Sequence, residues 1–381
     1  MAQRLERAVV IAYLQAQQTA RPEHQTWFAA FEDLYTKKLW HQLTLKLFDY
    51  ISHAPGNKDL LALHQNFIAE FEMRINPLAL VEFMSKLVYQ IQSNPDQCIE
   101  LIESVKPKVK QSKMASILCS IICGELKQIK GDVAGVEKLL EELTDEIDDV
   151  DGVTPVHARY YLLASDHYKL IGNHCKYYRN ALRYLGCLSD KEEIPQTLQQ
   201  QQERAFTLSL AALLGEDIYN FGELLQHPIM NSLDESKKWI VNLLEAFNTG
   251  DLSSYERLRP QWITQPDLAT HELNLRKKIS LLCLMEMTFR SLDGVLTFDQ
   301  IAQQSRARLD EVEMLVMRAL SLGLVRGTID QVEGIVHLTW VKPRVLNKQQ
   351  IISLKGRLEE LCKDARVMEG LLESKAQEIM S

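Results

Sequence analysis

The chain has 381 residues, of which 46% are hydrophobic and 25% are charged, and its formal net charge is −8 at neutral pH. This composition is typical of a folded globular protein, excludes wholesale disorder, and leaves room for two or three domains. The negative charge also removes the simplest electrostatic reason to expect a nucleic-acid-binding protein.

Cysteine usage indicates a reducing compartment. The seven cysteines are scattered and odd in number, and the sequence contains no Asn-x-Ser/Thr glycosylation acceptor. We therefore expect the protein in the cytoplasm and nucleus. The apolar run at residues 8–14 is too short for a convincing signal peptide and predicts an amphipathic helix or a loose end. No later segment approaches the roughly 18 uninterrupted apolar residues of a membrane span, so no membrane partner is expected.

Helical periodicity begins near residue 31 and continues for most of the chain. The first apolar face consists of Leu34, Leu39, Leu43, Leu47 and Ile51. Short turns such as Asn76-Pro77, Gly131-Asp132 and Gly172-Asn173 separate one helical pattern from the next. Paired helices in succession predict an α-solenoid, and the lack of a strict sequence period indicates diverged repeats.

The last third of the chain changes character. A strongly apolar helix is expected at 273–289, followed by a short helix at 298–304 with Thr297 as its N-cap, and by another helix at 310–322. Residues 324–330 and 335–340 alternate and are rich in β-branched residues, which predicts a hairpin. Helix, short helix, helix and hairpin in this order indicate a winged helix.

The tail predicts a helix with a narrow apolar seam. Eight apolar residues occupy successive a and d positions of a heptad, and only Lys375 breaks the pattern. The predicted seam residues are Ile351, Leu354, Leu358, Leu361, Ala365, Met368, Leu372 and Ile379. Such a helix either packs back on its own domain or bundles with other chains. Its length beyond the winged helix favours bundling.

The cysteine and histidine patterns do not predict a reactive or metal site. Cys119 and Cys123 share one helix face, but two further zinc ligands at suitable spacing are missing, so buried structural cysteines are expected. His174 and Cys175 are adjacent and point in different directions on a helix, which disfavours a nucleophile pair.

The acidic run at residues 141–151 also has a structural interpretation. In a calcium-loop alignment Ile147 and Ala158 would occupy the first and twelfth positions, so the loop fails and an exposed helix end is expected. The sequence also lacks the phosphate-binding, nucleophile-elbow and zinc-protease motifs. We therefore predict a protein that is not an enzyme and has no cofactor, catalytic residue or metal ligand.

The predicted winged helix is poorly suited to DNA. Its presumed recognition helix begins with Asp310, Glu311 and Glu313, which place carboxylates where phosphates would lie. We instead expect the second hairpin strand to act as an edge strand that pairs with a neighbouring subunit's sheet. Its residues are Ile335, Val336, His337, Leu338, Thr339 and Trp340.

Taken together, these segments resemble the PCI-domain proteins, which occur in the proteasome lid, the signalosome and a eukaryotic translation initiation factor. The similarity is strongest to the proteasome lid members. The residues that carry it lie at 34–44, 172–174, 177–186, 202–208, 221–225, 281–289 and 339–340.

The resemblance implies a fold that is dominated by α-helices: a right-handed α-solenoid of helix pairs, a winged-helix PCI domain with a small β-hairpin sheet, and a long C-terminal helix. The predicted divisions are a variable segment at 1–30, the solenoid at 31–270, the winged helix at 271–345 and a coiled-coil-type helix at 346–381.

The resemblance also implies a non-catalytic scaffold in the lid of the 26S proteasome's 19S regulatory particle, present in one copy, that supports ubiquitin-dependent degradation. Its partners would be other PCI-domain subunits and their neighbours, with no direct nucleic acid. In that family the winged helices pack side by side and the terminal helices form a bundle. The alternative is a PCI scaffold of an initiation factor, the signalosome or an RNA-export complex.

Overall fold

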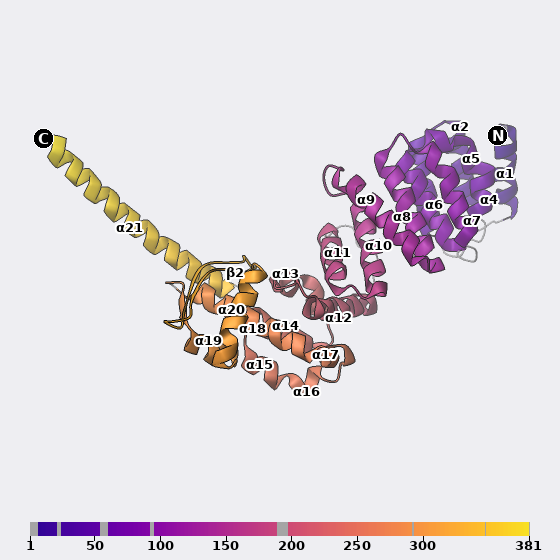
Figure 1. Ribbon diagram of the computed structural model, residues 1–381. Coiled ribbons are helices and arrows are strands. Elements are labelled where there is room, and N and C mark those ends of the chain that lie inside the picture. Colours follow the sequence, from indigo (N-terminus) through magenta and orange to yellow (C-terminus); the bar gives the residue numbers. More distant parts are fainter. Residues whose placement is uncertain are drawn as a thin grey trace. The chain divides into compact units, whose positions relative to one another are not determined.

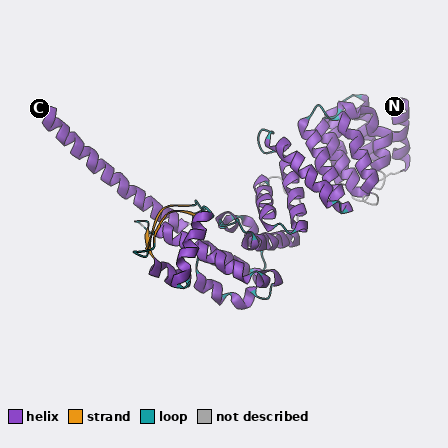
Figure 2. Cartoon of the chain, viewed as in Figure 1, coloured by secondary structure: helices purple, strands orange, loops and turns teal. Residues whose placement is uncertain are grey.

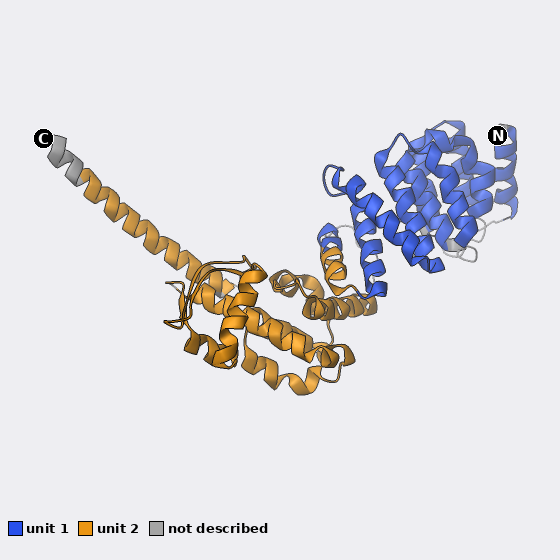
Figure 3. Ribbon diagram, viewed as in Figure 1, with its two compact units in different colours: residues 1–172, 183–191 blue, residues 173–182, 192–381 orange. Residues whose placement is uncertain are grey.

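The computed structural model describes residues 7–20, 24–53, 60–91, 95–188, 197–291, 293–346 and 348–380. Within these ranges the chain is helical except for one small three-stranded sheet near its C-terminal end (Figure 1, Figure 2). None of the described helices combines the length and the apolar character that crossing a bilayer requires. The chain divides into two compact units, residues 1–172 with 183–191 and residues 173–182 with 192–381 (Figure 3).

The described residues of the first unit form a succession of helices, with one π-helical turn and two short 3-10 turns. They are α1 (Arg7–Ala20), α2 (Gln25–Thr36), α3 (Trp40–His53), α4 (Leu60–Leu63), η2 (His64–Ile68), α5 (Ala69–Phe71), η3 (Glu72–Arg74), α6 (Pro77–Ile91), α7 (Pro95–Val105), η4 (Lys106–Lys108), α8 (Lys113–Lys130), α9 (Val133–Asp148) and α10 (Pro155–Ile171). Helix α11 (His174–Cys187) is divided between the two units.

Helix α1 belongs to the folded core, so residues 7–20 form the helix and not the loose end. Val10 and Leu14 are fully buried in the same apolar cluster as the aromatic rings of the next helices. In that cluster Phe31 and Tyr50 meet edge-on with ring centroids 5.7 Å apart. Large rings packed in this way bury much apolar area and add specific contacts, which fixes α1–α3 against one another.

The middle of the first unit has the repeated helix packing of a solenoid. Helix α8 contacts α6, α7, α9 and α10, so it is surrounded by its neighbours in sequence. Gly131 ends α8 with a φ of +85°, and Asp132 caps α9 by accepting the amide N–H of Gly135 at 3.0 Å. The predicted turn and the helical solenoid are both confirmed.

The second unit adds further helices and 3-10 turns before the winged helix. They are α12 (Leu198–Leu214), α13 (Gly222–Gln226), η5 (Pro228–Ser232), η6 (Glu235–Lys237), α14 (Trp239–Thr249), α15 (Leu252–Arg257), α16 (Arg259–Trp262) and α17 (Pro266–Thr270). The winged helix then comprises α18 (Glu272–Arg290), β1 (Val295–Thr297), α19 (Phe298–Ser305), α20 (Leu309–Ser321), β2 (Val325–Asp330) and β3 (Ile335–Val341).

The winged-helix prediction is confirmed in its helices and hairpin. Thr297 caps α19 through a reciprocal capping box, in which the backbone N–H of Gln300 donates to the Thr297 hydroxyl at 3.3 Å. The sheet has one strand more than the predicted hairpin. Strand β1 was not predicted, because its three residues are too few to show an alternation of apolar and polar side chains.

The prediction that residues 335–340 form an edge strand is wrong. The strand order is β1-β3-β2, so β3 is the central strand. Its Ile335, Val336 and His337 pair with β1 on one side and with β2 on the other. The next amide, of Leu338, donates to the carbonyl of Gly294 at 2.7 Å. Only Thr339, Trp340 and Val341 of β3 extend past β1, so among the described strands the outer positions belong to β1 and β2.

The predicted domain limits stay a prediction, but their places in the structure are known. Residue 30 lies inside α2, and residue 270 ends α17. Residue 345 lies in the connection between β3 and the C-terminal helix α21 (Lys348–Met380).

A buried lysine joins the solenoid-like part of the second unit to the winged helix. The ammonium group of Lys278 on α18 donates to the carbonyl oxygens of Ala212, Leu213 and Gly215 at 2.7, 3.0 and 2.7 Å. These carbonyls end α12, where helices leave backbone acceptors without internal partners and favour a positive charge. Lys278 therefore stabilises the contact between α12 and α18.

We expect Lys278→Met to lower the free energy of unfolding by about 1–3 kcal/mol, because it leaves buried carbonyl groups without a donor. Lys277→Met is the matched control, since Lys277 is exposed, and should change stability by less than about 0.5 kcal/mol. Urea unfolding measures both. Equal effects of the two substitutions would contradict this role of Lys278.

The burial of Lys278 also leads us to expect that the free energy of unfolding depends on pH. Burial lowers the pKa of Lys278 to about 7, whereas an unfolded lysine titrates near about 10.4. Between these values the unfolded state binds more protons, so the contribution of Lys278 to stability rises with pH across this window. The stability difference between wild type and Lys278→Met should thus shift in favour of wild type from about pH 7 to about pH 9.5. A difference that does not change with pH would contradict the lowered pKa.

Candidate assembly surface

Helix α21 presents an uncovered apolar face. Every residue from 351 to 373 is exposed, and the large predicted seam side chains up to Leu372 have exposed fractions between 40% and 66%. Ala365 is exposed as well, while Ile379 lies in the helix but its side chain is outside the described part. The exposed face of the helix therefore does not pack back on its own domain (Figure 1). Of the two predicted arrangements, bundling with helices of other chains remains.

The apolar face is wider than the predicted seam. Leu371, at heptad position g beside the seam, is 59% exposed, whereas Ile352 and Val367, each 62% exposed, stand at positions b and c on the far side of the helix. Leu371 extends the seam on one side, while the exposed Cys362 at position e borders it on the other. A face broader than a and d alone is typical of a helix in a multi-helix bundle. The sequence already contained this signal, since Leu371 is apolar and flanks the seam.

The start of α21 is fixed by a buried ion pair. Glu286 on α18 and Arg344 ahead of α21 are joined at 2.6 Å, and their side chains are only 6% and 9% exposed. Arg344 also donates to the carbonyl of Asn248, 3.0 Å away, near the end of α14. The amide of Gln350, in the first turn of α21, donates to Glu286 at 3.2 Å. The Glu286–Arg344 pair therefore connects α18, the end of α14 and the base of α21.

The connection at residues 342–346, which we call the strap, is held by contacts with residues 220–222 as well as by the ion pair of Arg344. The Val345 amide donates to the side-chain oxygen of Asn220 at 3.2 Å. A Cβ atom on Gly222 would lie 2.6 Å from the Cβ of Val345, so a side chain there would displace the strap. The strap is thus held from both sides, and it determines where α21 leaves the winged-helix domain.

The polar residues of the strap site could not be found from the sequence. Glu286 and Arg344 are 58 residues apart, and neither belongs to a recognisable motif. A buried pair of this kind becomes visible only when the fold brings α18 and the strap together.

Carboxylates compensate the two arginines that lie just ahead of the recognition helix α20. Arg306 forms an ion pair with Glu256. Arg308 lies 3.4 Å from Asp310 and 3.2 Å from Glu311. Because carboxylates already compensate both arginines, this face offers little attraction to a phosphate backbone.

The cysteine candidates are buried, as the sequence predicted. Burial raises the pKa of Cys119 to about 12 and that of Cys123 to about 11, which keeps both thiols protonated and unreactive. His174 and Cys175 are neighbours on α11. Within the described part of the chain, no three His, Cys, Asp or Glu side chains lie close enough together to hold a metal ion.

Comparison with known proteins agrees with the order of the two folded parts. Residues 27–244 match the family model of PSD13 N-terminal repeats, and residues 252–340 match the PCI domain. The chain belongs to the family of 26S proteasome non-ATPase regulatory subunit 13. The resemblance to PCI-domain proteins is therefore confirmed.

Relatives in the subunit 13 family are similar along nearly their whole length. Subunit 13 homolog A of Arabidopsis thaliana is 36% identical over 364 residues, which cover 92% of this chain and 93% of that protein. The probable 26S proteasome regulatory subunit rpn9 of Schizosaccharomyces pombe is 36% identical over 368 residues, with 95% of each chain covered. Regulatory subunit RPN9 of Saccharomyces cerevisiae is 32% identical over 377 residues, with 94% and 95% covered.

We expect Arg344→Met to lower the free energy of unfolding by about 3–5 kcal/mol, because it leaves the Glu286 carboxylate buried without its main partner. Arg290→Met is the matched control: Arg290 contacts the same carboxylate at 3.0 Å, but its side chain is 70% exposed. Its loss should cost less than about 1 kcal/mol. Denaturant unfolding of the two variants measures the two contributions separately. A larger loss of stability for Arg290→Met than for Arg344→Met would contradict the stabilising role of the buried Glu286–Arg344 pair.

Proposed function

We propose that this chain is a non-catalytic scaffold subunit of the lid of the 26S proteasome regulatory particle. It supports ubiquitin-dependent degradation by holding other PCI-domain subunits in place, through its winged helix and through bundling of α21. The single observation that carries this proposal is the uncovered apolar face of α21 on a chain of the subunit 13 family.

The energetics of α21 favour a multi-chain bundle. Burying one large apolar side chain is worth about 1.5–3 kcal/mol, and the helix exposes several of them along one face. A bundle with helices of other subunits buries this face, whereas the isolated chain leaves it in water. The contact is therefore a strong source of assembly energy.

The sheet supplies a second contact surface in this proposal. Within the described sheet, β2 pairs only with β3, so its outer backbone groups are available to a neighbouring winged helix. Arg326, Thr328 and Asp330 on this strand are exposed. Trp340 of β3 is 37% exposed and lies under the Arg326 guanidinium at 4.7 Å from the ring centre. PCI–PCI contact through β2 replaces the contact that the sequence assigned to β3.

The remaining expectations follow from the same proposal. One copy per lid, no cofactor, and no membrane or nucleic-acid partner are what a scaffold of this kind needs. The compensated Arg306 and Arg308, which lie just ahead of α20, and the negative net charge favour this proposal over a ribosome-bound or RNA-bound PCI scaffold. The scattered, unpaired cysteines suit a protein of the cytoplasm and nucleus.

We expect the joint replacement of Leu358, Leu361 and Met368 by Asp to abolish incorporation into the lid, while the rest of the chain stays folded. Three carboxylates in an apolar seam cost several kcal/mol on burial, which corresponds to a loss of affinity of more than about a hundredfold. Native mass spectrometry of the tagged chain, purified from its own cells, measures incorporation.

The matched control places Asp at Ser353, Gly356 and Gly370, which are exposed on the other faces of α21. This control adds the same three charges and should assemble normally. Wild-type chain found with proteasome lid subunits, in one copy, supports the proposal. Wild-type chain recovered as a monomer, or with ribosomal or RNA-export partners, would overturn it, as would normal incorporation of the seam variant.

A further inference from the structure

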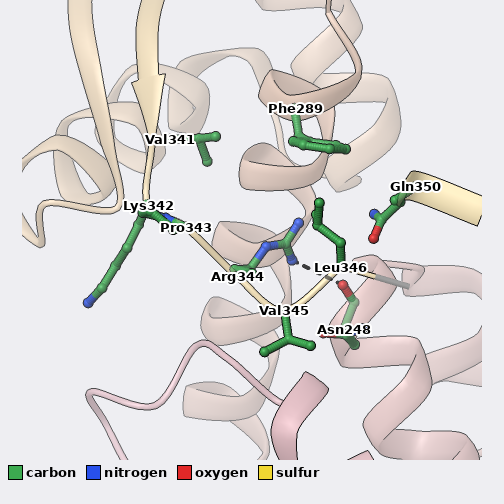
Figure 4. A pocket seen from close by; sticks show the side chains of 9 residues that line it. All are labelled: Asn248, Phe289, Val341, Lys342, Pro343, Arg344, Val345, Leu346 and Gln350. Carbon is green, nitrogen blue, oxygen red and sulfur yellow. Dashed lines mark hydrogen bonds between the residues drawn. The ribbon is translucent and has the colours of Figure 1, made fainter. Parts of the chain in front are cut away.

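A cavity of about 240 Å³ lies at the foot of α21, beside the strap (Figure 4). Its walls come from the end of α18, the end of α14, residues 341–346 and Gln350 in the first turn of α21. Phe289, Val341, Val345 and Leu346 are half-buried there, so apolar surface lines the cavity without filling it. We call this cavity the foot pocket.

The foot pocket has no uncompensated charge for an anion. The Arg344 guanidinium, one of its few charged groups, is already bound by Glu286 at 2.6 Å and by the Asn248 carbonyl at 3.0 Å. The Lys342 side chain points away from the other lining residues (Figure 4). An apolar occupant therefore fits the pocket better than a phosphate or a carboxylate.

The size of the pocket suits one large side chain. A dry apolar cavity of about 150 Å³ accepts a benzene molecule, so the foot pocket has room for a phenylalanine or leucine side chain. Filling it would remove Phe289 and Leu346 from water and add their dispersion contacts.

The foot pocket lies next to the start of the predicted seam of α21. Gln350 lines the pocket, and its side chain is fixed to Glu286 at 3.2 Å. Ile351, the first seam residue, follows directly in the chain. A helix that packs along the seam is therefore led to the mouth of the pocket.

We propose that the foot pocket is a socket for one large apolar side chain at the end of a partner subunit's helix that bundles with α21. This inference rests on the proposed function. It deepens that function by naming a contact that sets the register of the bundle. A heptad seam alone permits several registers that differ by whole heptads, whereas a filled socket permits a single register.

Alkylation of cysteines tests the bundling of α21 and the occupation of the foot pocket in one protein. Leu346→Cys places a thiol in the foot pocket, and the native, exposed Cys362 reports on the edge of the seam. The variant is treated with iodoacetamide as the isolated chain and within the purified regulatory particle, and peptide mass spectrometry follows each thiol. We expect both thiols to react at least tenfold more slowly in the particle.

The outcomes separate the two proposals. If Cys362 is protected but the thiol of Leu346→Cys reacts as in the isolated chain, the bundle forms without the socket and only this inference is wrong. If neither thiol is protected, both the inference and the proposed function fail. If only the pocket thiol is protected, the contact of one partner helix with both pocket and seam is contradicted and the inference falls.

A filling variant gives an independent readout. Leu346→Trp occupies the pocket from within and should compete at least tenfold less well than wild type for incorporation, the loss expected when an interface anchor is blocked. Leu273→Trp is the matched control, because Leu273 is 75% exposed at the start of α18. Equal competition by both variants, at equal melting temperature, would overturn the socket.

Discussion

The buried pair of Glu286 and Arg344 is the constraint on which the exit of the C-terminal helix depends. A carboxylate that is only 6% exposed is costly to bury without a charged partner, and Arg344 of the strap supplies that partner at 2.6 Å. The same guanidinium caps α14, and the same carboxylate binds Gln350 at the base of α21. Local electrostatics thereby determine where a long apolar helix leaves the winged-helix domain.

The rest of α21 has the opposite character. Beyond Gln350 the helix is exposed throughout the described side chains, so a firmly held base carries a face that its own chain does not cover. Such a helix gains stability only from what binds it, and by mass action its partners stabilise the chain as well. Fixing the base in advance reduces the conformational entropy lost on assembly, which is how a preorganised helix binds more tightly than a loose one. The fold therefore combines a fixed base of α21 with an exposed apolar face that is available to other subunits.

Features with a local signal could be predicted from the sequence. The Thr297 cap, the Gly131-Asp132 turn and the heptad of α21 each depend on residues a few positions apart. Features that join distant segments could not. Strand β1 is too short to show alternation, and it is the strand that places β3 in the centre of the sheet. Likewise, Lys278 is one lysine among many until the fold sets it beneath the end of α12.

The measurement that tests the central claim most directly is amide hydrogen exchange along residues 351–373, in the isolated chain and within the purified regulatory particle. Exposed helices open readily and exchange fast, whereas a helix in a packed bundle exchanges slowly. The account predicts that exchange in this segment slows by at least about a hundredfold on assembly, while the α8–α9 region of the solenoid changes little. Equal exchange of residues 351–373 in both states would contradict the claim that α21 is buried by other subunits.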